Sequence, residues 1–314
     1  MTKLVLPRSL SPCLRSFCSK TISVPKCTPK FPILPFNPAR AQQLLEKHAT
    51  LRGVEWRRFP ELNRILKGHR RGEMTILTGP TGSGKTTFLS EYSLDLALSG
   101  VRTLWGSFEI NNDRLTVTLL NQLAQVRLER HLHLFQQTAE EFSQLPIYFM
   151  DVHDERTLPI TLPNVIDTMS SAVSNFSVSH ILIDNLQFMM GASMKNMNRF
   201  EYQDSIIHAF RQFATKHDCH VTIVIHPRKE NTEELTNNSI AGGAKAIHES
   251  DNVLILQVKY SGTSFKYKKY LQVTKNRFDG QLGIIPLTFD HEKCGFGLRS
   301  FANHEVKSTM HLTE

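Results

Sequence analysis

The chain has little cysteine and no long apolar run, and both shortages narrow the class of protein. Its 314 residues include five cysteines, an odd number, and no C-x-x-C pair occurs. This argues against a disulfide scaffold as the basis of the fold. No apolar run is long enough to cross a lipid bilayer, so no membrane span is expected. The composition, with 40% hydrophobic and 21% charged residues, is that of an ordinary globular protein.

Acidic residues are missing from the first 45 positions. This stretch holds seven Lys or Arg and seven Pro but no Asp or Glu, and the first acidic residue is Glu46. The composition is typical of an organelle transit peptide, but a disordered basic linker and a chain that begins inside a larger protein remain open alternatives. Cys13, Cys18 and Cys27 lie here with a spacing that fits no common zinc motif. We assign residues 1–45 to a basic, proline-rich leader.

A glycine-rich stretch at residues 79–86 matches the phosphate-binding pattern G-x-x-x-x-G-K-[ST]. Glycines let successive backbone N–H groups turn toward phosphate oxygens. The lysine brings a cation to the β- and γ-phosphates and the threonine offers a hydroxyl to Mg²⁺, so the expected ligand is ATP or another nucleoside triphosphate with Mg²⁺. The expected nucleotide-binding residues are Gly79, Pro80, Thr81, Gly82, Ser83, Gly84, Lys85, Thr86 and Thr87.

The residues on either side of this loop supply the strand and the helix that the motif requires. Residues 74–78 form a short apolar, β-branched run that predicts a buried strand. Residues 86–99 place Leu89, Tyr92 and Leu96 near helical spacing before Gly100. A chance glycine-rich turn with an unrelated lysine is the alternative, and the strand–loop–helix order argues against it.

Strands and helical patterns alternate along the rest of the chain. This order predicts an α/β fold with a mainly parallel twisted sheet and helices on both faces. The last strands follow one another without helices, so that edge is predicted to be antiparallel. Expected strands are 74–78, 101–109, 146–150, 180–184, 220–226, 253–257, 270–275 and 284–289, and expected helices are 41–51, 59–66, 86–99, one capped by Asn112, one around 165–173 and 202–216. The domain prediction is a linker helix region at 46–53, a catalytic domain at 54–300 and a tail at 301–314.

Polar residues end three of the predicted strands, where parallel sheets bind their ligands. Glu109 could act as a general base toward an attacking water, although a solvated loop glutamate is the alternative. Asp184 after an Ile-Leu-Ile run suits a Mg²⁺ ligand, and otherwise caps a turn. His226 could contact the γ-phosphate, or it is an ordinary hydrogen-bonded histidine.

Basic residues elsewhere suggest further contacts with phosphate. Lys275 and Arg277 follow another strand, and an arginine suits charge stabilisation at a phosphoryl group, although a surface turn at 279–280 explains them equally well. Two longer segments, 188–199 and 229–245, could hold a single nucleic-acid strand or could simply be solvated loops. The candidate DNA-binding residues in them are Lys195, Arg199, Gly242, Gly243 and Lys245.

Five spaced motifs carry a resemblance to a known family. They are Arg70-Arg71-Gly72-Glu73, the run from Trp105 to Glu109, the run from Ile183 to Gly191, the run from Val224 to Lys229, and the run from Lys275 to Gly280. In this order they resemble the helicase domain of the Twinkle family of mitochondrial replicative DNA helicases, over about residues 54–290.

The resemblance implies a RecA-like, ring-forming motor, typically a hexamer, that moves 5′→3′ on single-stranded and forked DNA. It implies ATP and Mg²⁺ as cofactors, location in the mitochondrial matrix and nucleoid, and work beside other mitochondrial replication proteins. By the same resemblance Lys85 and Thr86 bind phosphate and Mg²⁺, Asp184 is the Walker B acid and Glu109 the base. His226 resembles the γ-phosphate sensor. Arg277, with Lys275 beside it, resembles the finger given to a neighbour's nucleotide, the two longer segments resemble DNA-contacting loops, and the helix at 41–51 resembles a linker that docks on an adjacent subunit.

The chain departs from the family in one respect. Family members carry a large primase-like region before the helicase domain, whereas only about 50 residues precede it here. A short isoform, an incomplete sequence and a lineage without that region are all compatible with this. Two other functions stay open, a RecA-like ATPase that binds or anneals single strands without unwinding, and a P-loop phosphotransferase that acts on a small molecule.

Overall fold

The computed structural model of the chain describes residues 34–152, 159–191, 199–228, 234–260 and 267–296. The chain divides after Leu51 into two units. In the described part of the first unit, helix α1 runs from Pro38–Thr50, close to the predicted 41–51. Its Leu44 and Leu45 side chains are 57% and 71% exposed. The predicted leader and C-terminal tail lie largely outside the described residues, so these boundaries stay predictions.

The second unit is built on a mainly parallel sheet. Its strands in the described residues are β1 Met74–Thr78, β2 Thr103–Ser107, β3 Ile147–Phe149, β4 His180–Asp184, β5 His220–Val224, β6 Asn252–Tyr260, β7 Tyr267–Asn276 and β8 Gly283–Leu287. They lie in the order β3-β2-β4-β5-β1-β6-β7-β8. Neighbouring strands run parallel from β3 to β6, and β6–β7 and β7–β8 are antiparallel, as predicted for that edge.

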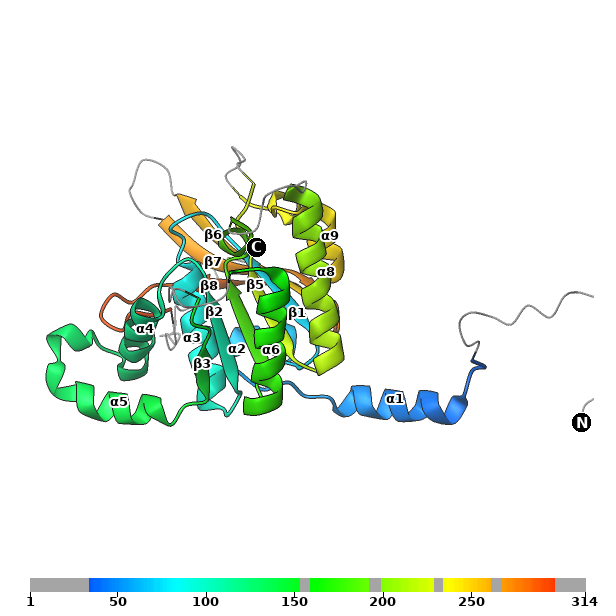
Figure 1. Cartoon of the computed structure of the whole chain (residues 1–314), viewed down its shortest axis with the longest axis horizontal. Coiled ribbons are helices and arrows are strands. Elements are labelled where there is room, and N and C mark those ends of the chain that lie inside the picture. Colours follow the sequence, from blue (N-terminus) through cyan, green and yellow to red (C-terminus); the bar gives the residue numbers. More distant parts are fainter. Residues whose placement is uncertain (1–33, 153–158, 192–198, 229–233, 261–266, 297–314) are drawn as a thin grey trace, which may run out of the picture. The chain divides into compact units, whose positions relative to one another are not determined.

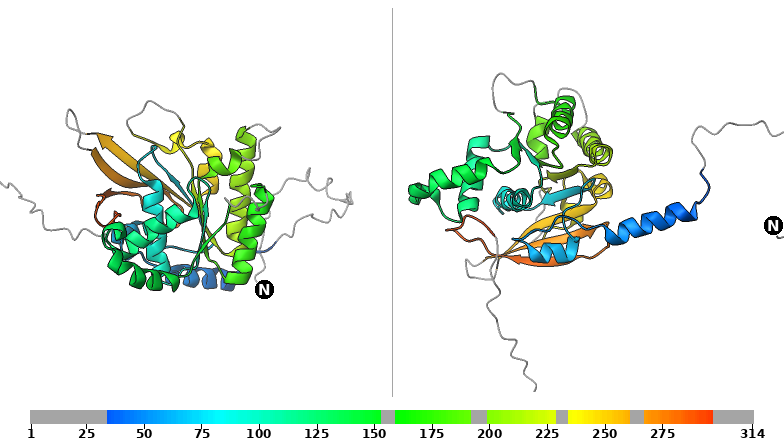
Figure 2. Two further views of the ribbon diagram at one scale, coloured as in Figure 1. Left: turned by 60° about the vertical axis from the view of Figure 1, so that its left-hand side comes forward. Right: turned by 90° about the horizontal axis from the view of Figure 1, so that it is seen from below.

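Helices cover both faces of this sheet (Figures 1 and 2). The helices of the second unit are α2 Pro60–Leu66, α3 Lys85–Leu98, α4 Asn112–Ala124, α5 Phe135–Ser143, α6 Leu162–Phe176, α7 Leu186–Gly191, α8 Arg199–His217 and α9 Gly243–Glu249. Alternation along each strand sends side chains to opposite faces. In β1, Met74 and Ile76 join the core beneath α6, α8 and α9, whereas Leu77 joins the core beneath α2, α3 and α4.

Most differences from the predicted elements lie at their ends. The predicted strand 101–109 is shorter, so Glu109 lies two residues beyond β2, and His226 lies two residues beyond β5. The prediction that Asn112 caps a helix is wrong. Asn111 is the cap, since its side-chain oxygen accepts the backbone N–H of Arg114 at 2.9 Å, and Asn112 is the first helical residue.

The antiparallel edge changes where one pair of predicted site residues lies. β7 runs opposite to β6 and ends where β6 begins, with Asn276 opposite Asn252. Lys275 and Arg277 therefore lie at the edge of the sheet where β1 starts, whereas the phosphate loop follows the end of β1. Because β1 has five residues, about 16 Å separates these two edges. Within a single chain, Lys275 and Arg277 therefore lie apart from the strand ends that carry Glu109, Asp184 and His226.

Candidate nucleotide-binding site

The glycine-rich loop between β1 and α3 has the geometry of a phosphate cradle. Gly84 caps α3 with φ 98° and no side-chain cap bond, so the first N–H groups of this helix are left for a ligand. A Cβ at Gly79 would lie 2.7 Å from the Leu256 carbonyl oxygen, so only glycine fits there. Gly82 has φ 74° and open space around it. The other predicted loop residues, Pro80, Thr81 and Ser83, lie in the same turn, and Thr87 lies in the first turn of α3.

Lys85 is folded onto the loop it belongs to. Its Nζ donates to the carbonyl oxygens of Gly79 at 2.9 Å and Pro80 at 3.1 Å, and the residue is 7% exposed. Burial lowers the pKa of Lys85, while the carboxylates of Asp184 and Glu109 act in the opposite direction. An anion of several charges bound in the cradle is the natural partner for this cation.

Thr86 and Asp184 form a pair of oxygen donors beside the cradle. The Thr86 hydroxyl donates to Asp184 Oδ2 at 2.6 Å. Asp184 is 1% exposed and burial raises its pKa to about 6. Its second oxygen, Oδ1, is buried and has no hydrogen-bond partner among the described residues. A hydroxyl and a carboxylate with an unused oxygen fit Mg²⁺, which prefers hard oxygen ligands.

Glu109 and His226 meet at the same edge of the sheet. His226 Nε2 lies 3.5 Å from Glu109 Oε2. Both contact the side chain of Asn185, the residue that follows Asp184. Burial and the charge of Lys85 lower the pKa of His226, with Glu109 opposing. The structure thus brings together Lys85, Thr86, Glu109, Asp184 and His226, the five strand-end and loop residues that the sequence predicts.

Lys269 and Phe296 belong to this site without any motif in the sequence. Lys269 Nζ donates to the Ser83 carbonyl oxygen at 2.9 Å and lies over the Phe296 ring at 5.6 Å. A hollow of about 300 Å³ adjoins them, and its lining includes Lys268, Phe289 and His291. The sequence around Lys269, which alternates charged and aromatic residues, does not predict this contact, because the contact depends on β7 lying two strands away from β1 in the sheet.

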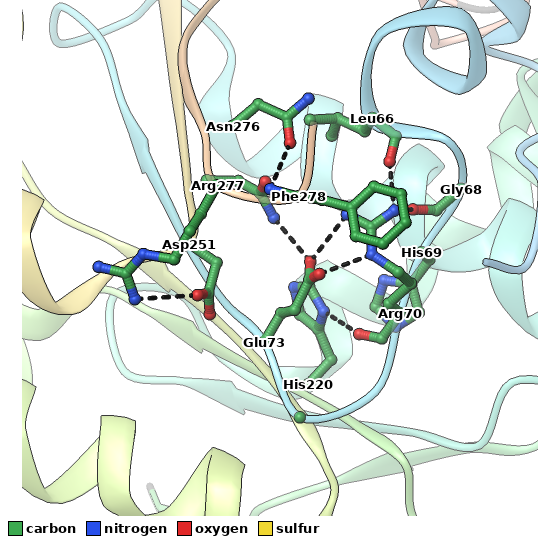
Figure 3. Close-up of polar contacts among 12 residues, drawn as sticks. Leu66, Gly68, His69, Arg70, Glu73, His220, Asp251, Asn276, Arg277 and Phe278 are labelled. Atoms are coloured by element: carbon green, nitrogen blue, oxygen red, sulfur yellow. Dashed lines mark hydrogen bonds and ion pairs between the residues drawn. The ribbon is translucent and has the colours of Figure 1, made fainter. Parts of the chain in front are cut away.

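Lys275 and Arg277 are held at the other edge. Figure 3 shows Arg277 beside Asp251 there. The Arg277 guanidinium donates to Asp251 Oδ1 at 3.1 Å and to the His248 carbonyl at 2.5 Å. Lys275 Nζ donates to the Ser250 carbonyl at 2.7 Å. Both cations therefore lie at the C-terminal end of α9, where the helix dipole favours positive charge. Half of the Arg277 side chain, 48%, remains exposed.

Two sequence motifs pack against each other at that edge. Arg70 pairs with Glu73 at 2.6 Å and lies 3.9 Å from the centre of the Phe278 ring. Phe278 follows Arg277 directly, so this contact fixes the turn that carries the arginine (Figure 3). The two alternatives for this stretch are thus compatible. The turn at 279–280 is held by the contact between Phe278 and Arg70, and the Arg277 guanidinium is exposed enough to contact a phosphate.

The candidate DNA-binding residues are only partly described. Lys195 lies outside the described residues, and Arg199 is the first residue of α8. Gly242 caps α9 with φ 93°, Gly243 begins that helix and Lys245 is exposed on it. The Ala241 N–H donates to the His226 carbonyl at 3.3 Å, so this segment is bonded to the strand end that carries His226.

No helix in the described ranges is long and apolar enough to cross a membrane.

The fold and the loop together define a P-loop NTPase with a RecA-like core. A family model described as an AAA domain matches residues 38–232, and the chain belongs to this family. Among solved structures, the ATPase domain of another protein matches with a TM-score of 0.69 and 16% identity, over 83% of this chain and 98% of that one. A DnaB-like replicative helicase, solved to show its interactions with primase, matches with a TM-score of 0.68 and 16% identity, over 85% of this chain and 67% of that one. At this identity the likeness concerns the fold.

Proposed function

We propose that the chain is the motor domain of an ATP-driven replicative DNA helicase of the Twinkle type, which acts in mitochondria on single-stranded and forked DNA in the 5′→3′ direction. The observation that carries the proposal is that the predicted phosphate-binding residues lie at two opposite edges of the sheet. The cradle, Asp184 and Glu109 lie at one edge, and Arg277 lies at the opposite edge, which is about 16 Å away along the strand direction. Such a division suits a closed ring, in which the arginine of each subunit completes the site of the next.

Each residue of the cradle has a task in hydrolysis. The loop N–H groups and Lys85 hold the phosphates, and Thr86 with Asp184 would hold Mg²⁺, which neutralises charge that develops on the β- and γ-phosphates. Glu109 accepts the proton of the attacking water. Arg277 of the adjacent subunit adds positive charge at the transition state, a contribution of about 10³–10⁵ in rate where such fingers act. The hollow beside Lys269 offers room for the base of the nucleotide.

The likeness to the DnaB-like fold supports a hexameric ring, and the acid-free leader supports a mitochondrial location with mitochondrial replication proteins as partners. Single-stranded DNA would contact the segment around Gly242, Gly243 and Lys245. This segment is hydrogen-bonded to the residues that follow β5, because the Ala241 N–H donates to the His226 carbonyl.

A complementation assay tests the proposal. The variants Lys85→Ala and Arg277→Ala are each expected to lose nearly all ATPase activity, measured with and without single-stranded DNA. In a mixture, an Arg277→Ala subunit keeps a good cradle and can be completed by a Lys85→Ala neighbour. Partial recovery on mixing, stimulated by DNA, supports a shared site in a nucleic-acid motor.

The competing functions give different results in the same experiment. A small-molecule phosphotransferase shows neither recovery nor a DNA effect. An annealing ATPase shows recovery on mixing and stimulation by DNA, but it does not unwind a duplex with a free 5′ tail. The proposed helicase unwinds that duplex.

A further inference from the structure

Asn185 is a buried side chain in the middle of the site, and no motif assigns it a role. It follows Asp184 at the end of β4, and the residue is fully buried. β4 lies between β2 and β5 in the sheet. Asn185 therefore stands between Glu109, which lies beyond the end of β2, and His226, which lies beyond the end of β5.

The orientation of the Asn185 amide is fixed by a backbone contact. Its Oδ1 accepts the N–H of Phe188 at 3.0 Å, the bond that caps α7. The Nδ2 group must then face the other way, toward Glu109 Oε2 and His226 Nε2. Nδ2 carries two hydrogens, so each can donate to one partner.

His226 accepts one of the two N–H groups of this amide. Its Nε2 lies 2.7 Å from Asn185 Nδ2, so the ring accepts there and carries its own proton on Nδ1. Its backbone N–H donates to Gln187 Oε1 at 3.2 Å, and its carbonyl accepts from Ala241. A shift of His226 therefore changes both the Asn185 contact and the segment that leads to Gly242.

We propose that Asn185 is a positioning residue of the ATPase site, whose two N–H bonds couple the position of the Glu109 carboxylate to that of the His226 imidazole. The inference rests on the proposed ATP hydrolysis but not on DNA unwinding. When His226 moves toward or away from the γ-phosphate, one hydrogen bond of the amide is lost or regained, and Glu109 is turned with it. The base is thereby aimed at water only when His226 is in its nucleotide-contacting position.

Two variants separate this role from the helix cap. Asn185→Ser and Asn185→Asp keep an oxygen that can cap α7 but remove the N–H donors. We expect kcat for ATP to fall about 10- to 100-fold in both, with the Kd for ATP within about twofold of wild type. Asn111→Ser makes the same substitution at the asparagine that caps α4, and it should keep wild-type kcat. Urea unfolding of each variant checks that the fold is retained.

A double-mutant cycle with His226→Ala decides between coupling and independent effects. If Asn185 acts by linking Glu109 to His226, Asn185→Ser/His226→Ala should hydrolyse ATP within about threefold of His226→Ala alone. A kcat loss in the double variant equal to the product of the two single losses overturns the inference. So does an unchanged kcat in Asn185→Ser, or a fall in ATP affinity that matches the fall in kcat. If the wild-type protein hydrolyses ATP and DNA does not change the rate, the helicase proposal fails, but the double-mutant cycle still decides the role of Asn185. If the wild-type protein hydrolyses no ATP, the helicase proposal and the role of Asn185 both fail.

Discussion

Lowering the pH from about 7.5 to about 5.5 should destabilise the second unit by about 3 kcal/mol, because three neutral histidines are buried together. His69, His180 and His220 are 4%, 0% and 2% exposed, with ring centres 4.2–5.5 Å apart. Burial lowers the pKa of each, and the other histidines of the cluster lower those of His69 and His180 further. His180 and His220 lie where β4 and β5 begin, at the edge away from the nucleotide site.

Hydrogen bonds in the cluster suit neutral rings. His220 Nδ1 donates to the Arg70 carbonyl at 2.6 Å and its Nε2 accepts from the Thr75 hydroxyl at 2.9 Å. His180 Nε2 contacts the Thr222 hydroxyl at 3.0 Å. Glu73 and Asp251 raise the pKa of His220, and burial outweighs them.

The sign and size follow from proton binding. An unfolded histidine takes up a proton near pH 6.5, whereas burial lowers the pKa of His220 and holds those of His69 and His180 well below that value. Their contribution to the free energy of unfolding is therefore complete above pH 6.5 and is lost as the pH falls. Over this interval His69 and His180 each contribute on the order of 1 kcal/mol and His220 up to the same, so the three together contribute roughly 3–4 kcal/mol. Asp184, with its raised pKa of about 6, acts in the opposite direction by less than about 1 kcal/mol. The net loss of about 3 kcal/mol is a large part of the roughly 5–15 kcal/mol by which a typical folded domain is stable.

The assay is urea unfolding of the full chain at both pH values. His180→Gln, which can still bond to Thr222, should reduce the loss on acidification by about a third. His133→Gln, at an exposed histidine, should leave the loss as in wild type. A wild-type loss below about 1 kcal/mol, or an undiminished loss in His180→Gln, would refute the reasoning.

Three further substitutions test the nucleotide site. Glu109→Gln should keep ATP affinity but lower kcat by about 10²–10⁴, measured by isothermal titration and steady-state kinetics, and normal turnover would exclude Glu109 as the base. Gly79→Ala should lower stability by about 1–3 kcal/mol and weaken ATP binding, because its Cβ would press on the Leu256 carbonyl. Gly82→Ala meets open space and should cost about 1–2 kcal/mol through its backbone conformation alone, with ATP binding affected less. Equal loss of ATP affinity in both variants would contradict the assigned contact.

The sequence predicts most of the sheet because its strands are short apolar runs with clear ends. Residues 74–78 and 180–184 match β1 and β4 to the residue. The apolar pattern does not predict α5, because the surface of this helix is polar, with Gln136 bonded to Glu140 one turn on. It does not predict α9 either, because that helix begins at a pair of glycines, which normally end a helix.

The sequence predicts a site residue when its type, together with a place in the glycine-rich loop or just after a strand, is enough to indicate its role. Lys85, Thr86, Asp184, Glu109 and His226 are found together for that reason. Asn185 and Lys269 receive no role from the sequence, because each acts through contacts between elements far apart in the chain. The sequence predicts that this edge is antiparallel, but no local pattern contains the register of β7 against β6, which places Arg277 beside Asp251.

Helix α9 spans seven residues, about 10 Å, and its two ends face different tasks in the proposed ring. Gly242 and Gly243 at its start belong to the segment assigned to DNA, and the carbonyls at its end hold Lys275 and Arg277. A strand of DNA that displaces the start of α9 would thus move the finger that reaches into the adjacent subunit, ahead of any change at the chain's own ATP. A structural change caused by DNA binding would then be transmitted in one direction around the proposed ring, from each subunit to the neighbour that its Arg277 reaches. The topology of a single chain would set that direction.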